Sequence, residues 1–225
     1  LRRYGALPEA AVSLARRIDQ HANLTLSGVS THFASSDEPD EIFTAEQYAL
    51  YQRVVTDLAS EGIISGSFHV ANSAALITGV GIEQGMVRAG IALYGMPPSE
   101  HVPLPAGLHP AMRIESRVAR VTPLEPGDTV GYNRKWRAET PTVGVLVPIG
   151  YADGYRRGLF GKSWAGLGGR QAPLLGRVSM DQTVFEAPAG VTVQAGDPIH
   201  LMGRPEDGAP TAADLAAILD TNTYE

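Results

Sequence analysis

The sequence predicts an α/β region followed by a mainly β region, and three observations lead to this fold class. Up to residue 112, stretches of helical periodicity alternate with short β-branched runs, as in parallel strands joined by helices. Beyond that point, short alternating segments are separated by Gly and Pro, as in antiparallel sheets. Pro-rich residues 97–110 separate the two patterns. We therefore expect one domain over 1–112 and a second over 113–225.

The first region predicts helices and strands in turn. Pro8 begins a helix of about three turns, and residues 26–33 form a strand. The Thr-Ala-Glu-Gln run at 44–47 predicts a capping box for the next helix, which Gly62 ends. Further strands are expected at 68–71 and 86–87. Because a closed eight-fold barrel needs about 250 residues, the roughly three βα units found here cannot close one.

The second region predicts five strands and a final helix. A type II turn is expected at 125–128, a flexible hairpin at Gly166, Gly168 and Gly169, and a capping box at Thr211 and Asp214. The strands are expected at 112–121, 142–149, 172–178, 182–186 and 199–202.

Composition narrows the function classes. The 225 residues carry a net charge of -6 with no basic block, so a nucleic-acid partner is not expected. Without cysteine, disulfides and thiolate metal sites are excluded, and we predict no metal centre and a reducing, cytoplasmic location. No apolar run reaches the about 18 residues of a membrane span. Phosphate-loop, dinucleotide, metalloprotease and hydrolase-elbow motifs all fail on spacing or on a missing residue.

The two ends of the sequence resemble the interior of a protein. Residue 1 is Leu, and residues 221–225 follow a helical run directly. We expect both ends to lie within a longer chain.

Polar side chains follow the predicted parallel strands, where barrel enzymes carry their chemistry. These segments are 32–34, 69–73 and 88–91. Ser73, with the amides of Gly90 and Ile91, could cradle a phosphate, although Ser73 and Gly90 could equally shape turns. Residues 148–155 form a polar turn with two tyrosines and a carboxylate, typical of a binding site or of a solvated loop.

Taken together and in this order, these segments resemble the alanine racemases, which are fold-type III pyridoxal phosphate enzymes. The resemblance covers essentially the whole chain and rests on the segments 3–5, 31–34, 71–75, 86–95, 130–132, 149–154 and 176–182.

The resemblance implies the C-terminal part of a TIM (β/α)8 barrel followed by a mainly β domain. It implies a homodimer with active sites between the barrel of one subunit and the β domain of the other. It also implies pyridoxal 5'-phosphate and the two-base interconversion of L-alanine and D-alanine, which supplies D-alanine for bacterial peptidoglycan. One base is the lysine that holds the cofactor as a Schiff base, and the other is Tyr132 from the partner chain.

Roles for other residues also follow from the resemblance. A free tyrosine, with a pKa near 10, is a poor base at neutral pH, and His32 backed by Arg88 would make Tyr132 basic. Arg88 would also face the pyridine nitrogen, to which it can donate a hydrogen bond but not a proton. The remaining cofactor-binding residues would be His69, Asn72, Ser73, Gly90 and Ile91, and the substrate-binding residues Arg3, Tyr151, Met180 and Asp181.

One departure from the family pattern is the lysine. The chain contains only Lys135 and Lys162, and neither stands in the family's lysine context. The first barrel units and the distal C-terminal segment of the family are missing as well, so we expect these 225 residues alone to be inactive. Two alternatives remain open at this point: a non-catalytic binding or assembly module, or a related pyridoxal phosphate racemase or decarboxylase acting on another amino acid.

Overall fold

The computed structural model describes residues 1–63 and 66–225 and consists of two compact units, Leu1–Pro110 and Ala111–Glu225. In the described part of the chain, no helix is long and apolar enough to cross a membrane.

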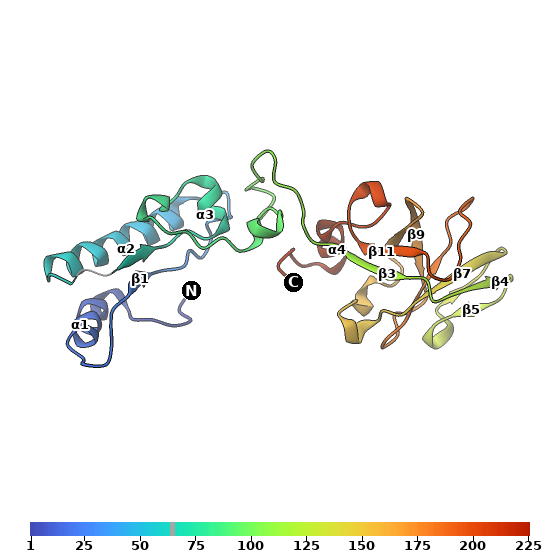
Figure 1. Ribbon diagram of the computed structural model, residues 1–225, viewed down its shortest axis with the longest axis horizontal. Helices are drawn as coiled ribbons and strands as arrows, with labels where there is room; N and C mark the ends of the chain where they lie inside the picture. Colours follow the sequence, from blue (N-terminus) through green and yellow to red (C-terminus); the bar gives the residue numbers. More distant parts are fainter. Residues whose placement is uncertain (64–65) are drawn as a thin grey trace. The chain divides into compact units, whose positions relative to one another are not determined.

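The first unit contains two βα units (Figure 1). Strand β1 pairs in parallel with β2, Val29 lying opposite Phe68, and each strand leads into a helix. The order is α1 (Pro8–Asp19), β1 (Gly28–Ser30), α2 (Ile42–Ser60), β2 (Ser67–His69) and α3 (Ser73–Thr78), then the 3-10 turns η1 (Ile82–Gln84) and η2 (Ile91–Tyr94). The predicted order of helices and strands is confirmed in this unit as far as β2.

Both strands are shorter than predicted because side chains take over their hydrogen bonds. After Ser30, the Thr31 carbonyl accepts from Arg88 and the His32 carbonyl accepts from Gln47. The chain therefore leaves the ladder where the polar residues begin. The strand expected at 86–87 is wrong: among the described residues, only Gly85 bridges Phe68 there.

The predicted capping box at 44–47 is also wrong. Helix α2 begins earlier, at Ile42, whose N–H donates to the Asp40 carboxylate at 2.9 Å. Thr44 is buried in the first turn, and the Gln47 side chain turns to the loop after β1. The helix is held by its apolar face, because Tyr51 and Leu58 are buried beneath it.

The second unit contains a seven-stranded antiparallel sheet in the order β3-β11-β8-β9-β10-β7-β4 (Figure 1). Its strands are β3 (Ile114–Arg117), β4 (Arg120–Leu124), β7 (Thr142–Val147), β8 (Trp164–Leu167), β9 (Arg170–Leu175), β10 (Thr183–Glu186) and β11 (Pro198–Met202). Consecutive strands β3 and β4 lie at opposite ends of this order although only two residues join them, so the sheet curls back towards itself. One core, which includes Phe185 and Val145, fills it.

Several predictions for this unit are confirmed. Asp128 N–H donates to the Glu125 carbonyl at 2.9 Å with Gly127 at φ 101°, as a type II turn requires. Thr211 and Asp214 exchange capping hydrogen bonds at the start of α4 (Ala212–Leu219). Gly168 and Gly169 join β8 to β9, whereas Gly166 lies within β8. The short hairpin of β5 (Thr129–Val130) and β6 (Trp136–Arg137) was not predicted.

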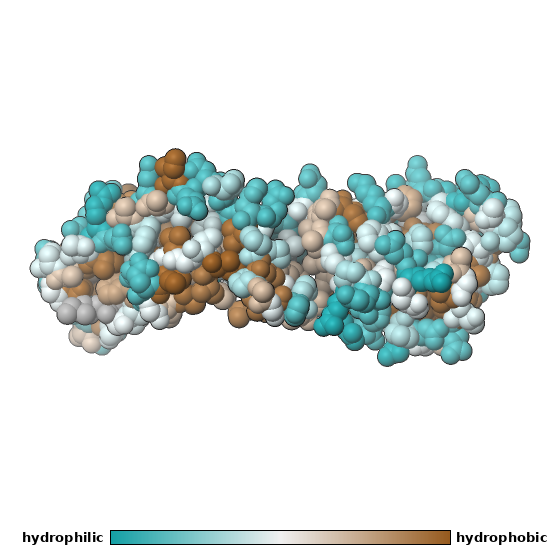
Figure 2. Space-filling model, turned by 90° about the horizontal axis from the view of Figure 1, so that it is seen from above, coloured by the Kyte–Doolittle hydropathy of each residue, from teal (hydrophilic) through white to brown (hydrophobic). Residues whose placement is uncertain are grey.

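Most of the exposed large hydrophobic side chains belong to the first unit, and Figure 2 shows such side chains at its surface. Met86 and Val87 are among them. A two-stranded parallel sheet has two open edges and cannot cover its own apolar side chains.

Candidate active site

Arg88 is the centre of a polar cluster in the first unit. Its guanidinium donates to three backbone carbonyls, of Thr31 at 2.7 Å, His69 at 3.2 Å and Val70 at 3.3 Å. It also contacts Nδ1 of His69 and, at 3.3 Å, Nδ1 of His32. The carbonyls come from the ends of β1 and β2, so the parallel pairing itself brings both histidines to one guanidinium.

The guanidinium sets the state of both imidazoles. Arginine can only donate, so each Nδ1 accepts and each neutral ring carries its proton on Nε2. Partial burial, and then the Arg88 charge, lower the pKa of His32 and of His69 below 6.5, and Arg3 lowers that of His32 further. Both rings are therefore neutral hydrogen-bond donors at Nε2 near pH 7, and Arg3 lies close enough to His32 to act on it.

A second cluster surrounds Ser73 at the start of α3. The Ser73 side chain is 3% exposed, and its Oγ accepts from the N–H groups of Gly90 at 2.8 Å and Ala92 at 3.3 Å. These bonds use the lone pairs, so the hydroxyl proton remains to be donated. Asn72 caps α3 through Oδ1, which accepts from Ala75 N–H at 3.0 Å and from Ser36 Oγ at 2.9 Å.

The residues around Ser73 fit the phosphate of a cofactor. A Cβ added to Gly90 would meet only Ser73 Oγ, at 3.9 Å, so the glycine leaves room beside the Ser73 hydroxyl. A hydroxyl that keeps its proton can donate to an oxygen of an anion placed there. The contacts above use Nη1 and Nη2 of Arg88, which leaves its Nε–H to donate to a ring nitrogen. The anchoring lysine has no counterpart here, since Lys135 and Lys162 both lie in the second unit.

In the second unit, glycines bring three site segments together. A Cβ on Gly131 would lie 2.9 Å from Arg177 N, one on Gly176 would lie 2.5 Å from the Val130 carbonyl oxygen, and one on Gly150 would lie 2.4 Å from the Met180 carbonyl. No other residue type permits these backbone approaches. Each glycine lies directly before or within a site segment predicted from the sequence.

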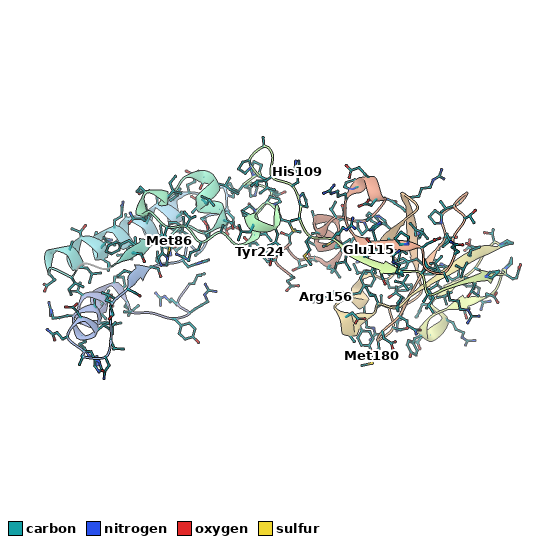
Figure 3. The ribbon with its side chains drawn as sticks, viewed as in Figure 1. Met86, His109, Glu115, Arg156, Met180 and Tyr224 are labelled. Atoms are coloured by element: carbon teal, nitrogen blue, oxygen red, sulfur yellow. The ribbon has the colours of Figure 1, made fainter. Side chains whose placement is uncertain are left out.

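These contacts gather Tyr132, Tyr151, Met180 and Asp181 on one part of the unit. The N–H of Tyr151 donates to the Ser179 carbonyl at 3.0 Å, and that of Ala152 to the Met180 carbonyl at 2.8 Å. Tyr132 is 67% exposed, and the Met180 side chain projects from the surface (Figure 3). Tyr155, by contrast, is buried edge-on against Phe185, and burial raises its pKa to about 12. Among the described tyrosines of this unit, Tyr132 is thus the most exposed, ahead of Tyr224 and Tyr151.

Sequence reasoning missed several residues that shape these clusters. Arg157 stacks over the Tyr151 ring, 5.6 Å from its centroid. Ser36 and Gln47 hold the loop after β1, although neither carries a motif of its own. The pairs Gly131-Tyr132 and Gly176-Arg177 are no signal by themselves, because glycine also precedes a polar residue elsewhere, as in Gly161-Lys162.

We expect Gly131→Ala to destabilise the second unit far more than Gly127→Ala. Both glycines have positive φ, 75° and 101°, so alanine is strained at each by about 1 kcal/mol. Only at Gly131 does the new Cβ also meet backbone, because at Gly127 the nearest atom is an Arg137 side-chain nitrogen at 3.8 Å. The free energy of unfolding, from urea titration, should fall by about 1 kcal/mol for Gly127→Ala and by roughly 2–4 kcal/mol for Gly131→Ala. Equal losses would show that the close approach to Arg177 is unimportant.

Comparison with known proteins identifies relatives over the whole chain. The family model of the alanine racemase N-terminal domain matches residues 1–98, and that of the C-terminal domain matches residues 111–225. Alanine racemases of Desulfovibrio desulfuricans and Symbiobacterium thermophilum are 37% and 35% identical over 99% of the chain. The chain spans 59% of the length of each of these two relatives.

Solved structures of alanine racemases also match the chain. The structure of alanine racemase from Bacillus anthracis with bound L-Ala-P matches the entire chain with a TM-score of 0.90 and 33% identity, and 58% of that protein is covered. The Clostridium difficile 630 alanine racemase in complex with cycloserine matches 97% of the chain with a TM-score of 0.88 and 31% identity, again over 58% of its own length. The predicted fold class, the C-terminal part of a (β/α)8 barrel followed by a mainly β domain, is confirmed by this likeness.

Proposed function

Because the chain belongs to the alanine racemase family, we propose that the protein containing it interconverts L-alanine and D-alanine with pyridoxal 5'-phosphate. The observation that carries the proposal is Arg88, held by three carbonyls between the Nδ1 atoms of His32 and His69. With Arg88 on its Nδ1, the neutral His32 would carry its proton on Nε2 and donate from there.

The first unit would bind and orient the cofactor. Ser73, Gly90 and Ile91 would hold its phosphate, with Asn72 fixing the start of α3. Arg88, with His69 behind it, would donate to the ring nitrogen. When bound, the cofactor supplies an electron sink that makes the α-proton of the amino acid acidic.

Tyr132 would move the proton on one face. We propose that it enters from the second unit of a partner subunit in a homodimer, with its phenol oxygen accepting from His32 Nε2. A hydrogen bond to the phenolate, backed by the Arg88 charge, favours the ionised base. Arg3 would bind the substrate carboxylate, and Tyr151, Met180 and Asp181 would line the entrance. The opposite face needs a second base, the family's lysine, which these 225 residues lack.

We further propose that the product D-alanine serves bacterial cell-wall synthesis in the cytoplasm. This role rests on the family alone.

The direct test is racemisation by the natural protein that contains this chain. Purified with pyridoxal phosphate and given L-alanine in D2O, it should form D-alanine with deuterium at the α-carbon. The reverse reaction should proceed as well. Absence of α-deuterium from both enantiomers at saturating cofactor would refute the proposed activity.

The same assay separates the alternatives. A binding module would take up the cofactor without exchanging the α-proton of any amino acid. A racemase of another specificity would exchange serine or lysine faster than alanine. We expect alanine to be fastest, because every relative described above is named for it.

A further inference from the structure

Gln47 lies on α2, apart from the residues expected to touch cofactor or substrate, yet its side-chain amide forms hydrogen bonds with the loop after β1. Its Oε1 accepts from Ala34 N–H at 3.1 Å. Its Nε2 donates to the His32 carbonyl at 2.8 Å and to Thr31 Oγ1 at 3.4 Å. One side chain therefore bonds to the backbone of His32 and of Ala34 and to the side chain of Thr31.

Only a primary amide of this length can make this set of bonds. It combines an acceptor with two donors in one plane, whereas a carboxylate offers acceptors alone and an aliphatic chain offers neither. Asparagine carries the same group but is one methylene shorter. Glutamine is therefore the residue type that satisfies the hydrogen-bonding groups of this loop.

The helix does not depend on Gln47 for its own position. The Tyr51 hydroxyl donates to the Val29 carbonyl at 2.9 Å, and Tyr51 and Leu58 are 6% and 1% exposed. These buried contacts anchor α2 on the strands. The Gln47 side chain, which is only partly buried, instead forms its hydrogen bonds with the loop after β1.

The loop in turn sets the geometry of the Arg88 cluster. The Thr31 carbonyl accepts from Arg88 at 2.7 Å, and His32 Nδ1 lies 3.3 Å from the same nitrogen, Nη2. A shift of the loop would move both contacts together. The Arg3 charge also acts on His32, so its environment on this side is cationic.

We propose that Gln47 is a positioning residue that holds His32 against Arg88 and aims His32 Nε2 at the catalytic base. The inference rests on the proposed function, because it assigns Gln47 to that same site.

The test uses three variants of the natural protein that contains this chain. Gln47→Ala removes all three hydrogen bonds. Gln47→Glu keeps the acceptor for Ala34 N–H and loses both donors. Gln52→Ala is the matched control, because Gln52 lies on the same helix and interacts with Tyr48 instead. The readouts are kcat and KM for alanine, the imidazole pKa of His32 by 15N NMR, and the melting temperature.

Gln47→Ala and Gln47→Glu should each lower kcat by roughly tenfold, because His32 would no longer be aligned with the catalytic base Tyr132. KM should change less than about twofold, because the residues that bind cofactor and substrate stay in place. In Gln47→Ala the pKa of His32 should rise towards 6.5, since the freed loop leaves His32 less buried and farther from the Arg88 charge. Gln52→Ala should match the wild type in kcat, KM and the pKa of His32.

A lower melting temperature in Gln47→Ala with unchanged kcat and unchanged pKa of His32 would reduce Gln47 to a structural brace and overturn the inference. The measurement of the His32 pKa by NMR also separates the positioning role of Gln47 from the proposed racemase function. If the wild type racemised nothing, the proposed function would fail, yet the response of His32 to Gln47→Ala would still decide whether Gln47 positions it.

Discussion

Replacing Tyr132 by phenylalanine should lower alanine racemisation by the natural protein by about 10³-fold or more. The change removes one oxygen from a side chain that is 67% exposed, so neither packing nor folding should suffer. It takes away the atom proposed to accept and return the proton on one face.

The two faces should respond differently. Net conversion must fall equally in both directions, because the variant cannot change the equilibrium between the enantiomers. Deuterium exchange at the α-carbon, however, should be lost for one enantiomer and retained for the other, whose proton is taken by the second base. Proton NMR in D2O measures both rates.

Tyr155→Phe is the matched control, since this tyrosine lies in the core of the same unit against Phe185. We expect wild-type racemisation from it. Two-way racemisation at the wild-type rate in Tyr132→Phe would remove Tyr132 from its role.

Replacing Arg88 by glutamine should have the second largest effect, a loss of kcat of about 10²–10³-fold. The charge disappears, and the carbonyls of Thr31, His69 and Val70 lose their shared donor. Leaving such groups unpaired costs about 1–3 kcal/mol in the free energy of unfolding. Arg88→Lys keeps the charge but cannot span the three carbonyls, so it should recover little of the activity.

The pH dependence should change as well. In the wild type, the lowered pKa values of His32 and His69 mean that the unfolded chain binds protons more readily than the folded one. The free energy of unfolding should therefore decrease as pH falls below about 6.5 through the folded pKa values. Arg88→Gln removes one cause of the shift, so both pKa values should rise and this decrease should become shallower. An equally steep decrease in Arg88→Gln would show that Arg88 does not act on the two histidines.

Much of the fold could be predicted from the sequence because local signals agreed with tertiary packing. The Pro8 helix, the turn at Gly127 and the capping box at Thr211 are local devices whose hydrogen bonds close within a few residues. The box at 44–47 failed for the opposite reason: Thr44 is buried and Gln47 bonds to a loop 13 residues away, so tertiary contacts override the local motif.

For the candidate site, too, some residues could be predicted from the sequence, and others depend on tertiary contacts. His32, His69 and Arg88 could be proposed from their places after expected strands, and parallel pairing does bring them together. Gly131 and Gly176 could not be singled out, because their role lies in a backbone approach between segments more than 40 residues apart. Pairwise contacts of that kind leave no periodic trace in one sequence.

The central claim, that one subunit's Tyr132 works with the other subunit's His32 and Arg88, is tested most directly by mixing two inactive variants. Tyr132→Phe and Arg88→Gln chains of the natural protein should be co-expressed with different tags and the mixed dimer isolated. Each mixed dimer would hold one intact site and one site with both defects, so it should regain about half of the wild-type kcat per dimer. If the three residues of a site came from one chain, both sites would be defective, and a mixed dimer as inactive as its parents would contradict the account.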